Sequence, residues 1–135
     1  MRSVRVVAAV IEEDGRFLIT QRRPEAVLPL LWEFPGGRVE PDESDGQALR
    51  RELAERLGVE IEVRDKLSTQ GHDYEGYSVT LVIYSARLTN GQPRCVHVND
   101  FRWVASADFD AYDFPPADQA TMDKLLGISH PSKTN

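Results

Sequence analysis

The sequence predicts an α+β fold in which a mixed β-sheet is combined with one strong helix. The run Val4–Ile11 is nearly continuous in apolar and β-branched residues, which is typical of a strand buried on both faces. Leu49, Leu53 and Leu57 recur at every fourth residue and make one apolar stripe, the leucine stripe, along a helix at about residues 45–57. Strand-like runs outnumber helical ones along the chain, which favours the α+β class.

The ends of this helix are marked by capping signals. Ser44, with Gln47 three residues later, makes a capping box, in which each side chain accepts a hydrogen bond from the other residue's backbone N–H. Asp45 adds negative charge to the first turn, where the helix dipole favours it. Gly58 stands where a helix C-terminus commonly takes a left-handed residue. The helix is therefore expected to end at about residue 57.

The remaining elements are predicted from short apolar runs and turn residues. Asp14 and Gly15 are typical of a hairpin turn, which predicts that Phe17–Thr20 pairs with the first strand. A final helix is predicted at Pro116–Leu126, and a flexible tail at 129–135 after a single domain at 1–128. Further strands are expected at Trp32–Phe34, Ile61–Gln70, Ser78–Leu88, Arg94–Val98 and Phe101–Val104.

Composition and charge limit the partners of the protein. The formal net charge of −6 argues against binding of a long nucleic acid backbone, which needs a basic surface. A small polyphosphate can still bind if a divalent metal supplies the positive charge. Hydrophobic residues make up 41% of the 135 residues and charged residues 28%, as expected for one soluble globular domain. A monomer and a homodimer both stay open.

Cys95 argues against a site built from several cysteines, and the N-terminal apolar run argues against a membrane segment. A single cysteine excludes an internal disulfide and a cysteine-rich zinc site. Its strand-like surroundings favour a buried or half-buried packing residue over a catalytic thiol. Val4–Ile11 is too short to span a membrane, and the acidic residues 12–14 that follow do not suit a signal peptide. We therefore expect a cytoplasmic protein with no membrane contact.

Two carboxylates on the predicted helix suggest a metal site. Glu52 and Glu55 stand three residues apart beside the leucine stripe and can share one divalent ion. Hard oxygen ligands favour Mg²⁺, with Mn²⁺ as the alternative. Gly36 and Gly37 allow close approach of the backbone just upstream, so a carbonyl there can complete the coordination. Taken alone, the same charges also suit a solvated helix face.

The spacing of these residues narrows the interpretation. Gly37, Glu43 and the segment Arg51–Val59 resemble the Nudix box, G-x5-E-x7-R-E-U-x-E-E-x-G-U with U a bulky aliphatic residue, at eight of its nine fixed positions. The segment Phe34–Gly37 and the later Trp103 are similar to the MutT-like branch of that family, the nucleotide-pool pyrophosphohydrolases. The resemblance covers most of the chain. It implies an α/β/α sandwich whose catalytic helix is the one predicted above.

The resemblance also implies roles for the matching residues. Glu52 and Glu55 would be metal ligands, and Glu52 would alternatively orient or deprotonate the attacking water. Gly36 would offer its carbonyl as a further ligand. Arg51 and Glu43 would form a buried ion pair that holds the preceding loop against the helix.

Two positions depart from the family pattern. Arg56 stands where the family has a second adjacent glutamate. It can pair with Glu52 one turn earlier and weaken metal binding, or bind phosphate directly. His97 stands six residues before Trp103, where the family often supplies a glutamate. It is a candidate replacement ligand or base near neutral pH, and equally a strand histidine that faces solvent.

Other positions similar to the MutT-like branch suggest how substrate is bound. Asp118 stands where that branch places a base-reading Asn or Asp, although a residue of the first helical turn would also suit this position. An ionised Asp accepts a hydrogen bond from an exocyclic amine, whereas a protonated one also donates, as a guanine-type edge needs. Arg22 would contact phosphate or sugar, or lie at a solvated strand end, and Gly37 would also contact the substrate. The candidates to stack on the base are Tyr74, Tyr77 and Phe34, the last equally suited to the core.

The function implied by the resemblance is Mg²⁺-dependent hydrolysis of a nucleoside triphosphate to the monophosphate and pyrophosphate. CTP-like nucleotides, or oxidised deoxynucleotides such as 8-oxo-dGTP, are the first substrates to expect, in sanitation of the nucleotide pool. The departures at Arg56 and His97 leave an alternative, a nucleotide-binding module of Nudix fold with weakened catalysis. Cleavage of a nucleotide-sugar or dinucleotide also stays open, although the short chain favours smaller substrates.

Overall fold

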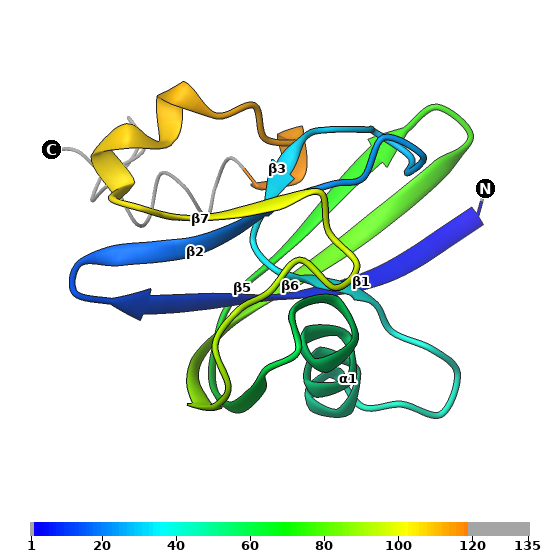
Figure 1. Ribbon diagram of the computed structural model, residues 1–135. Helices are drawn as coiled ribbons and strands as arrows, with labels where there is room; N and C mark the ends of the chain where they lie inside the picture. Colours follow the sequence, from blue (N-terminus) through cyan, green and yellow to red (C-terminus); the bar gives the residue numbers. More distant parts are fainter. Residues whose placement is uncertain (1, 119–135) are drawn as a thin grey trace, which may run out of the picture.

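The computed structural model describes residues 2–118, which form a seven-stranded mixed sheet with one α-helix, α1 (Asp45–Leu57), packed on one face (Figure 1). The predicted α+β class is confirmed. The second helical layer of the expected sandwich depends on residues 116–126. Of these the structure describes a 3-10 turn, Pro116–Asp118, and the rest lies outside the described residues, as does the predicted tail at 129–135. No helix within residues 2–118 is long and apolar enough to cross a membrane.

The sheet consists of β1 (Arg2–Glu13), β2 (Arg16–Gln21), β3 (Trp32–Glu33), β4 (Gly36–Arg38), β5 (Glu60–Tyr74), β6 (Tyr77–Asn90) and β7 (Asp100–Val104). Five strands lie in the order β3-β2-β1-β6-β5, while β4 pairs with β1 and β7 with β2. β1 and β6 run parallel, with Val4 opposite Val79 and Ala9 opposite Tyr84. The other pairings within residues 2–118 are antiparallel, so the sheet is mixed, as predicted. After β7 the chain forms a 3-10 helix at Ser106–Ala111.

β1 is buried on both faces along its middle, as its apolar composition predicts. Residues Val7–Ile11 are all buried. Alternate side chains join a core cluster beneath α1 and a second cluster on the opposite face, because successive side chains of a strand point to opposite faces. The predicted hairpin between β1 and β2 is present and turns at Asp14 and Gly15, both with positive φ (53° and 77°), as a tight hairpin turn requires.

α1 begins and ends at the predicted caps. The Ser44 Oγ accepts the Gln47 N–H at 3.1 Å, and the Gln47 Oε1 accepts the Ser44 N–H at 2.9 Å. Gly58 follows the last turn in the left-handed conformation, with φ of 70°. These caps satisfy backbone groups that have no partner within the helix.

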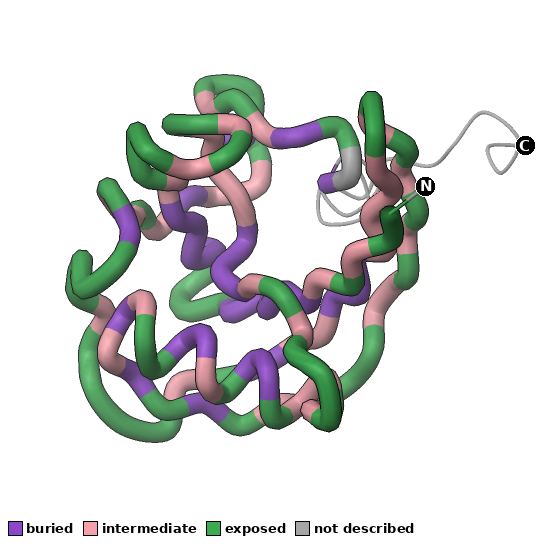
Figure 2. The backbone as a smooth tube through the Cα atoms, turned by 90° about the vertical axis from the view of Figure 1, so that its right-hand side faces the viewer, coloured by how far each residue is buried: buried purple, intermediate pink, exposed green. Residues whose placement is uncertain are grey.

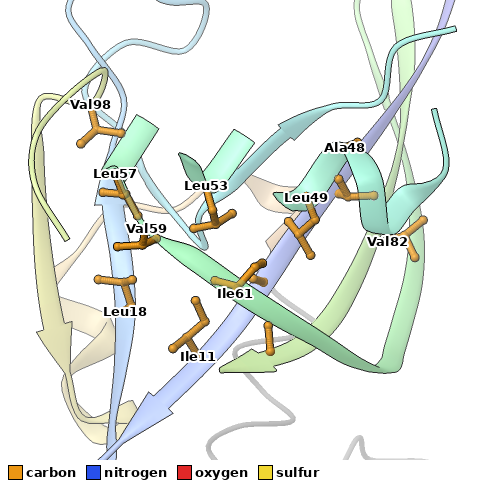
Figure 3. Packing of buried hydrophobic residues seen from close by; sticks show 13 residues of the cluster. Ile11, Leu18, Ala48, Leu49, Leu53, Leu57, Val59, Ile61, Val82 and Val98 are labelled. Carbon is orange, nitrogen blue, oxygen red and sulfur yellow. The ribbon is translucent and has the colours of Figure 1, made fainter. Parts of the chain in front are cut away.

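The leucine stripe of α1 is fully buried and makes the first core cluster. Figure 3 shows these leucines close to Ile11 of β1 and Ile61 of β5. Buried and exposed positions alternate along α1 in Figure 2, as expected for an amphipathic helix. The first turn is fixed to the sheet by polar contacts, since Asp45 pairs with Arg5 at 2.7 Å and accepts the Tyr84 hydroxyl at 2.6 Å. Apolar burial and these contacts together set the position of α1.

The opposite face of the sheet holds a second core cluster that is rich in aromatic rings. Phe34 is 1% exposed, and its ring centroid lies 5.9 Å from that of Phe109 and 5.7 Å from that of Phe114. Because the ring is enclosed by these neighbours, it has no free face for a base. The core role of Phe34 is therefore confirmed, and its predicted substrate-binding role is wrong.

Residues 94–98, predicted to form a strand, are irregular in the structure. Their backbone N–H groups bind the end of α1 instead. Arg94 donates to the Leu57 carbonyl at 2.9 Å, and His97 donates to the Arg56 carbonyl at 3.0 Å. The carbonyls of a last helical turn lack partners within the helix, and this segment supplies them. Its apolar alternation resembles that of a strand, but its hydrogen bonds go to a helix.

The exposure of Cys95 follows from the same correction. Its expected burial depended on a strand whose alternate side chains point inward. The segment that contains it is irregular, and the Cys95 side chain is exposed. The expectation of a buried or half-buried cysteine is therefore wrong.

Strands β5 and β6 make a longer hairpin than predicted. Their pairing continues beyond Gln70 to Tyr74 opposite Tyr77, and the turn lies at Glu75 and Gly76. Gly76 has a φ of 86°, which glycine adopts without strain. The extension was missed because backbone pairing there continues without the apolar alternation that marks a strand in the sequence. It brings two tyrosines to the end of the hairpin.

The leucine stripe should dominate the stability of the fold. Leu53→Ala should lower the free energy of unfolding by about 2–5 kcal/mol, because it removes buried apolar area and leaves a cavity. Urea denaturation checks this. Leu30→Ala is the matched control, since Leu30 is 46% exposed and its truncation should cost less than about 0.5 kcal/mol. Equal losses in the two variants would contradict the packing described for α1.

Candidate active site

Arg51 lies at the centre of a charged cluster that joins α1 to the loop before it. Its guanidinium donates two hydrogen bonds to the Glu43 carboxylate, at 2.7 and 3.0 Å. It also donates to the Arg38 carbonyl at 3.0 Å, and its Nη1 lies 3.1 Å from Glu52 and 3.3 Å from Glu55. The predicted Arg51–Glu43 pair is present, but it is half-buried rather than buried. The loop between β4 and α1 is thus held against the helix by one side chain.

Both members of this ion pair are stabilised in their charged forms. The Arg51 guanidinium lowers the pKa of Glu43 from 4.5 to about 2, and a hydrogen bond from the Glu40 N–H acts in the same direction. The hydrogen bond to Glu43 in turn raises the pKa of Arg51. The Arg51–Glu43 pair therefore stays charged at neutral pH.

Glu52 is the most enclosed carboxylate of the cluster, with 7% of the residue exposed. Its Oε2 lies 3.1 Å from Arg51, and its Oε1 lies 2.6 Å from the Nε of Arg56. The pairing of Arg56 with Glu52 one turn earlier is thus as the sequence predicted. A Cβ atom at Gly37 would overlap the Glu52 carboxyl group. A side chain at this position would therefore push the Glu52 carboxylate out of its place.

The oxygen donors at this place suit a hard divalent cation. Glu52 and Glu55 both contact Arg51, so their carboxylates lie on the same side of α1. Gly36 lies so close to β1 that a Cβ atom there would overlap the Val7 carbonyl. Within residues 2–118 no group of three or more Asp, Glu, His or Cys side chains converges on one point. The structure thus places two carboxylates on one side of α1, with Glu52 against Gly37 of β4.

His97 is not brought into this donor set. Its ring nitrogens lie 3.1 and 3.4 Å from a guanidinium nitrogen of Arg23, and its side chain is exposed. The segment around it is no strand, so of the predicted alternatives only the exposure to solvent matches the structure. The placement gives no support to His97 as a replacement ligand.

A cavity of about 500 Å³ adjoins the charged cluster. It lies between the loop after β2, the strands β1, β4 and β6, and the 3-10 turn Pro116–Asp118. Its lining includes the predicted substrate residues Arg22, Gly37, Arg56 and Asp118, together with Gly36, Glu33, Tyr74 and Tyr77. Four of the predicted substrate residues, distant in sequence, therefore share one cavity.

Two carboxyl groups, Glu33 and Asp118, lie in the wall of this cavity. Asp118 is 4% exposed, and burial, with the nearby negative charge of Glu33, raises its pKa well above 3.8. Burial also raises the pKa of Glu33, although Arg22 opposes this from 3.0 Å. No functional role was predicted for Glu33 from the sequence. The sequence feature that could have indicated it is an acidic residue between two aromatic ones, Trp32 and Phe34, in a short strand.

Comparison with known proteins agrees with the spacing of the box. Residues 6–124 match the family model of the NUDIX domain. The chain belongs to the Nudix family. It is 34% identical over 128 residues to the CTP pyrophosphohydrolase of Escherichia coli K12, with 95% of each chain covered. It is 27% identical over 126 residues to the 8-oxo-dGTP diphosphatase of that strain, covering 93% of this chain and 98% of that protein.

A solved structure agrees in fold as well as in sequence. The crystal structure of the MutT NUDIX hydrolase from Burkholderia pseudomallei superposes with a TM-score of 0.76 at 28% identity, covering 96% of this chain and 100% of that one. The protein is therefore a MutT-like Nudix hydrolase, as the sequence predicted.

Loss of the Glu43 carboxylate should flatten the acid side of the stability profile. Because the pKa of Glu43 is about 2 in the folded state and ordinarily 4.5, its pairing stabilises the fold above pH 4.5. This contribution is lost as the pH falls through about 2. In Glu43→Gln, urea midpoints measured across this range should fall less steeply than in wild type.

The matched control for this measurement is Glu12→Gln, which removes an exposed carboxylate at the end of β1. It should keep the wild-type slope. Parallel profiles for Glu43→Gln and wild type would show that the Arg51–Glu43 pair adds no pH-dependent stability.

Proposed function

We propose that the protein hydrolyses a nucleoside triphosphate to the monophosphate and pyrophosphate with the help of Mg²⁺ or Mn²⁺. The observation that supports this most directly is the single cavity that joins Gly36, Gly37 and Arg56 to Glu33 and Asp118. One set of groups suits a polyphosphate and the other suits the edge of a base. We further propose that the enzyme acts in the cytoplasm, where it would clear unwanted nucleotides from the pool.

The size of the cavity favours a single nucleotide over larger substrates. A volume of about 500 Å³ lies within the usual range for small-molecule sites. A nucleotide-sugar or a dinucleotide would need more room than a single nucleotide. The proposed substrate class is therefore a mononucleotide carrying a polyphosphate.

The charged groups near the cavity are proposed to have different roles in cleaving a phosphate bond. Glu52, Glu55 and the Gly36 carbonyl would hold the metal, which when bound would neutralise polyphosphate charge and make a water molecule more acidic. Glu52 is also the candidate to orient or deprotonate that water. Arg22 and Arg56 add positive charge to the lining of the cavity in a protein whose net charge is −6.

Asp118 is proposed to read the base, with Glu33 as its neighbour. In its ionised form Asp118 would accept a hydrogen bond from an exocyclic amine, as CTP provides. In its neutral form it would both donate and accept, as the guanine-type edge of 8-oxo-dGTP requires. The E. coli relatives named for CTP and for 8-oxo-dGTP make both nucleotides the first to test. Tyr74 and Tyr77, with ring centroids 5.2 Å apart, are candidates to stack on the base.

A second candidate function, a nucleotide-binding module with weakened catalysis, is favoured by one observation. The Nε of Arg56 lies 2.6 Å from the Oε1 of Glu52, an oxygen that a metal-dependent enzyme would need as a metal ligand. This module would bind nucleotide in the presence of EDTA and turn over slowly with any metal. Arg56→Glu would weaken such binding, whereas in a metal-dependent enzyme it would mainly change the metal affinity.

Glu55→Gln should abolish pyrophosphate release. A panel of nucleotides incubated with Mg²⁺ or Mn²⁺ should yield pyrophosphate from at least one nucleotide, and the variant should be slower by about a hundredfold or more, because a metal ligand is lost. Glu13→Gln, an exposed carboxylate in β1, is the control and should keep the wild-type rate. Equal rates for Glu55→Gln and wild type would refute the assigned site.

Asp118→Asn should remove a pH dependence of base selection. The raised pKa of Asp118 means that acid favours its neutral form, so the ratio of kcat/KM for CTP over 8-oxo-dGTP should fall as the pH is lowered. An asparagine donates and accepts at every pH, so its ratio should stay constant. A change of about tenfold is expected in wild type, from one hydrogen bond of about 1.4 kcal/mol. A wild-type ratio that does not vary with pH would refute base reading by this carboxyl.

A further inference from the structure

Glu52 has each of its oxygens paired with a different guanidinium. Arg51 lies 3.1 Å from Oε2, and Arg56 lies 2.6 Å from Oε1. With 7% of Glu52 exposed, little room is left for a further partner unless one guanidinium moves. The site as it stands is filled by the protein's own cations.

The two arginines differ in how easily each can move away from Glu52. Arg51 is held by two hydrogen bonds to Glu43 and by one to the Arg38 carbonyl, besides its contacts along α1. Among the described residues the Arg56 guanidinium forms an ion pair with Glu52 and acts on Glu33 through its charge, and 30% of its side chain is exposed. Arg56 also lines the cavity, so its guanidinium can turn from Glu52 toward a ligand there. The movable partner is Arg56.

We propose that Arg56 is an internal latch on the metal site, which exchanges Glu52 for a substrate phosphate when a divalent cation binds. The inference rests on the proposed function, since it takes Glu52 as a metal ligand and the cavity as the polyphosphate site. A divalent cation and a guanidinium repel one another at contact distance, so each weakens the binding of the other to the Oε1 of Glu52. A guanidinium released beside a cation is stabilised once an anionic phosphate lies next to it.

The latch couples two binding events. A cation on its own must displace Arg56 from Glu52 and therefore binds weakly. When a polyphosphate binds with the cation, the displaced Arg56 has a new partner. Each ligand therefore raises the affinity for the other by the same factor, as thermodynamic linkage requires. The protein then keeps its metal site closed until nucleotide is present.

The first arm of the test measures the cation without nucleotide. Free Mn²⁺ is followed by electron paramagnetic resonance during titration of wild type, Arg56→Gln and Arg56→Lys. Arg56→Gln should bind Mn²⁺ about tenfold more tightly than wild type, because the competing cation is gone. Arg56→Lys keeps a competing charge and should stay within about threefold of wild type. Arg50→Gln is the matched control, since it removes the same charge from an exposed position on α1 and should change the affinity by less than about threefold.

The second arm measures a non-hydrolysable CTP analogue by calorimetry, once in EDTA and once in saturating Mg²⁺. In EDTA, Arg56 stays on Glu52, so Arg56→Gln should bind the analogue within about threefold of wild type, a small loss that comes from the missing charge in the lining. In Mg²⁺ the variant should bind it about tenfold more weakly, because the released Arg56 is missing. Mg²⁺ that binds the analogue in solution contributes equally to both proteins and cancels in the comparison.

Three results would overturn the latch. One is an unchanged or weaker Mn²⁺ affinity in Arg56→Gln. Another is an equal gain in Arg50→Gln, which would point to general electrostatics. The third is a loss of analogue affinity of equal size with and without Mg²⁺, which would make Arg56 a permanent phosphate ligand. Because the Mn²⁺ arm contains no nucleotide, its failure is distinct from failure of the proposed function, which is a nucleotide panel without pyrophosphate release.

Discussion

The charged end of the molecule depends on how one guanidinium is shared. Arg51 binds Glu43 through two of its nitrogens, reaches the Arg38 carbonyl, and lies within 3.3 Å of Glu52 and Glu55. A planar group with five donors can serve so many acceptors at once, and it stays charged at any pH of interest. Without it the carboxylates would repel one another, and the loop that follows β4 would lose its attachment to α1. Lysine, with a single ammonium, could not hold the same set.

The helix could be predicted closely because its signals are local. The capping box, the leucine stripe and Gly58 each act within a few residues of the chain, so their meaning does not depend on the rest of the fold. The segment 94–98 shows the opposite case. Its alternation of apolar residues suits a strand, but its N–H groups bind the last carbonyls of α1, which a sequence pattern does not reveal. Local patterns predict elements, and distant backbone partners can override them.

Part of the candidate site could also be predicted from the sequence. The box spacing placed Glu52 beside Gly37, and helix periodicity predicted its pair with Arg56. Glu33 was missed because its neighbour in the cavity wall, Asp118, belongs to the chain after β7, which packs on β2 and β3 through Phe109 and Tyr112. The box residues could thus be identified from their spacing along α1, whereas the cavity wall that contains Glu33 and Asp118 is assembled from segments that are distant in sequence.

The irregular segment that caps α1 has a consequence for how this part of the protein can change. It holds the helix end through backbone N–H groups, while the side chains of Arg94, Cys95 and His97 are exposed. Substitutions there should be well tolerated, whereas insertions and deletions would shift the N–H groups away from the carbonyls. The residue types at these three positions can therefore vary, whereas the length of the segment cannot. The single cysteine of the chain sits within this segment, which makes it a ready attachment point for a fluorescent reporter of the helix end that bears Arg56.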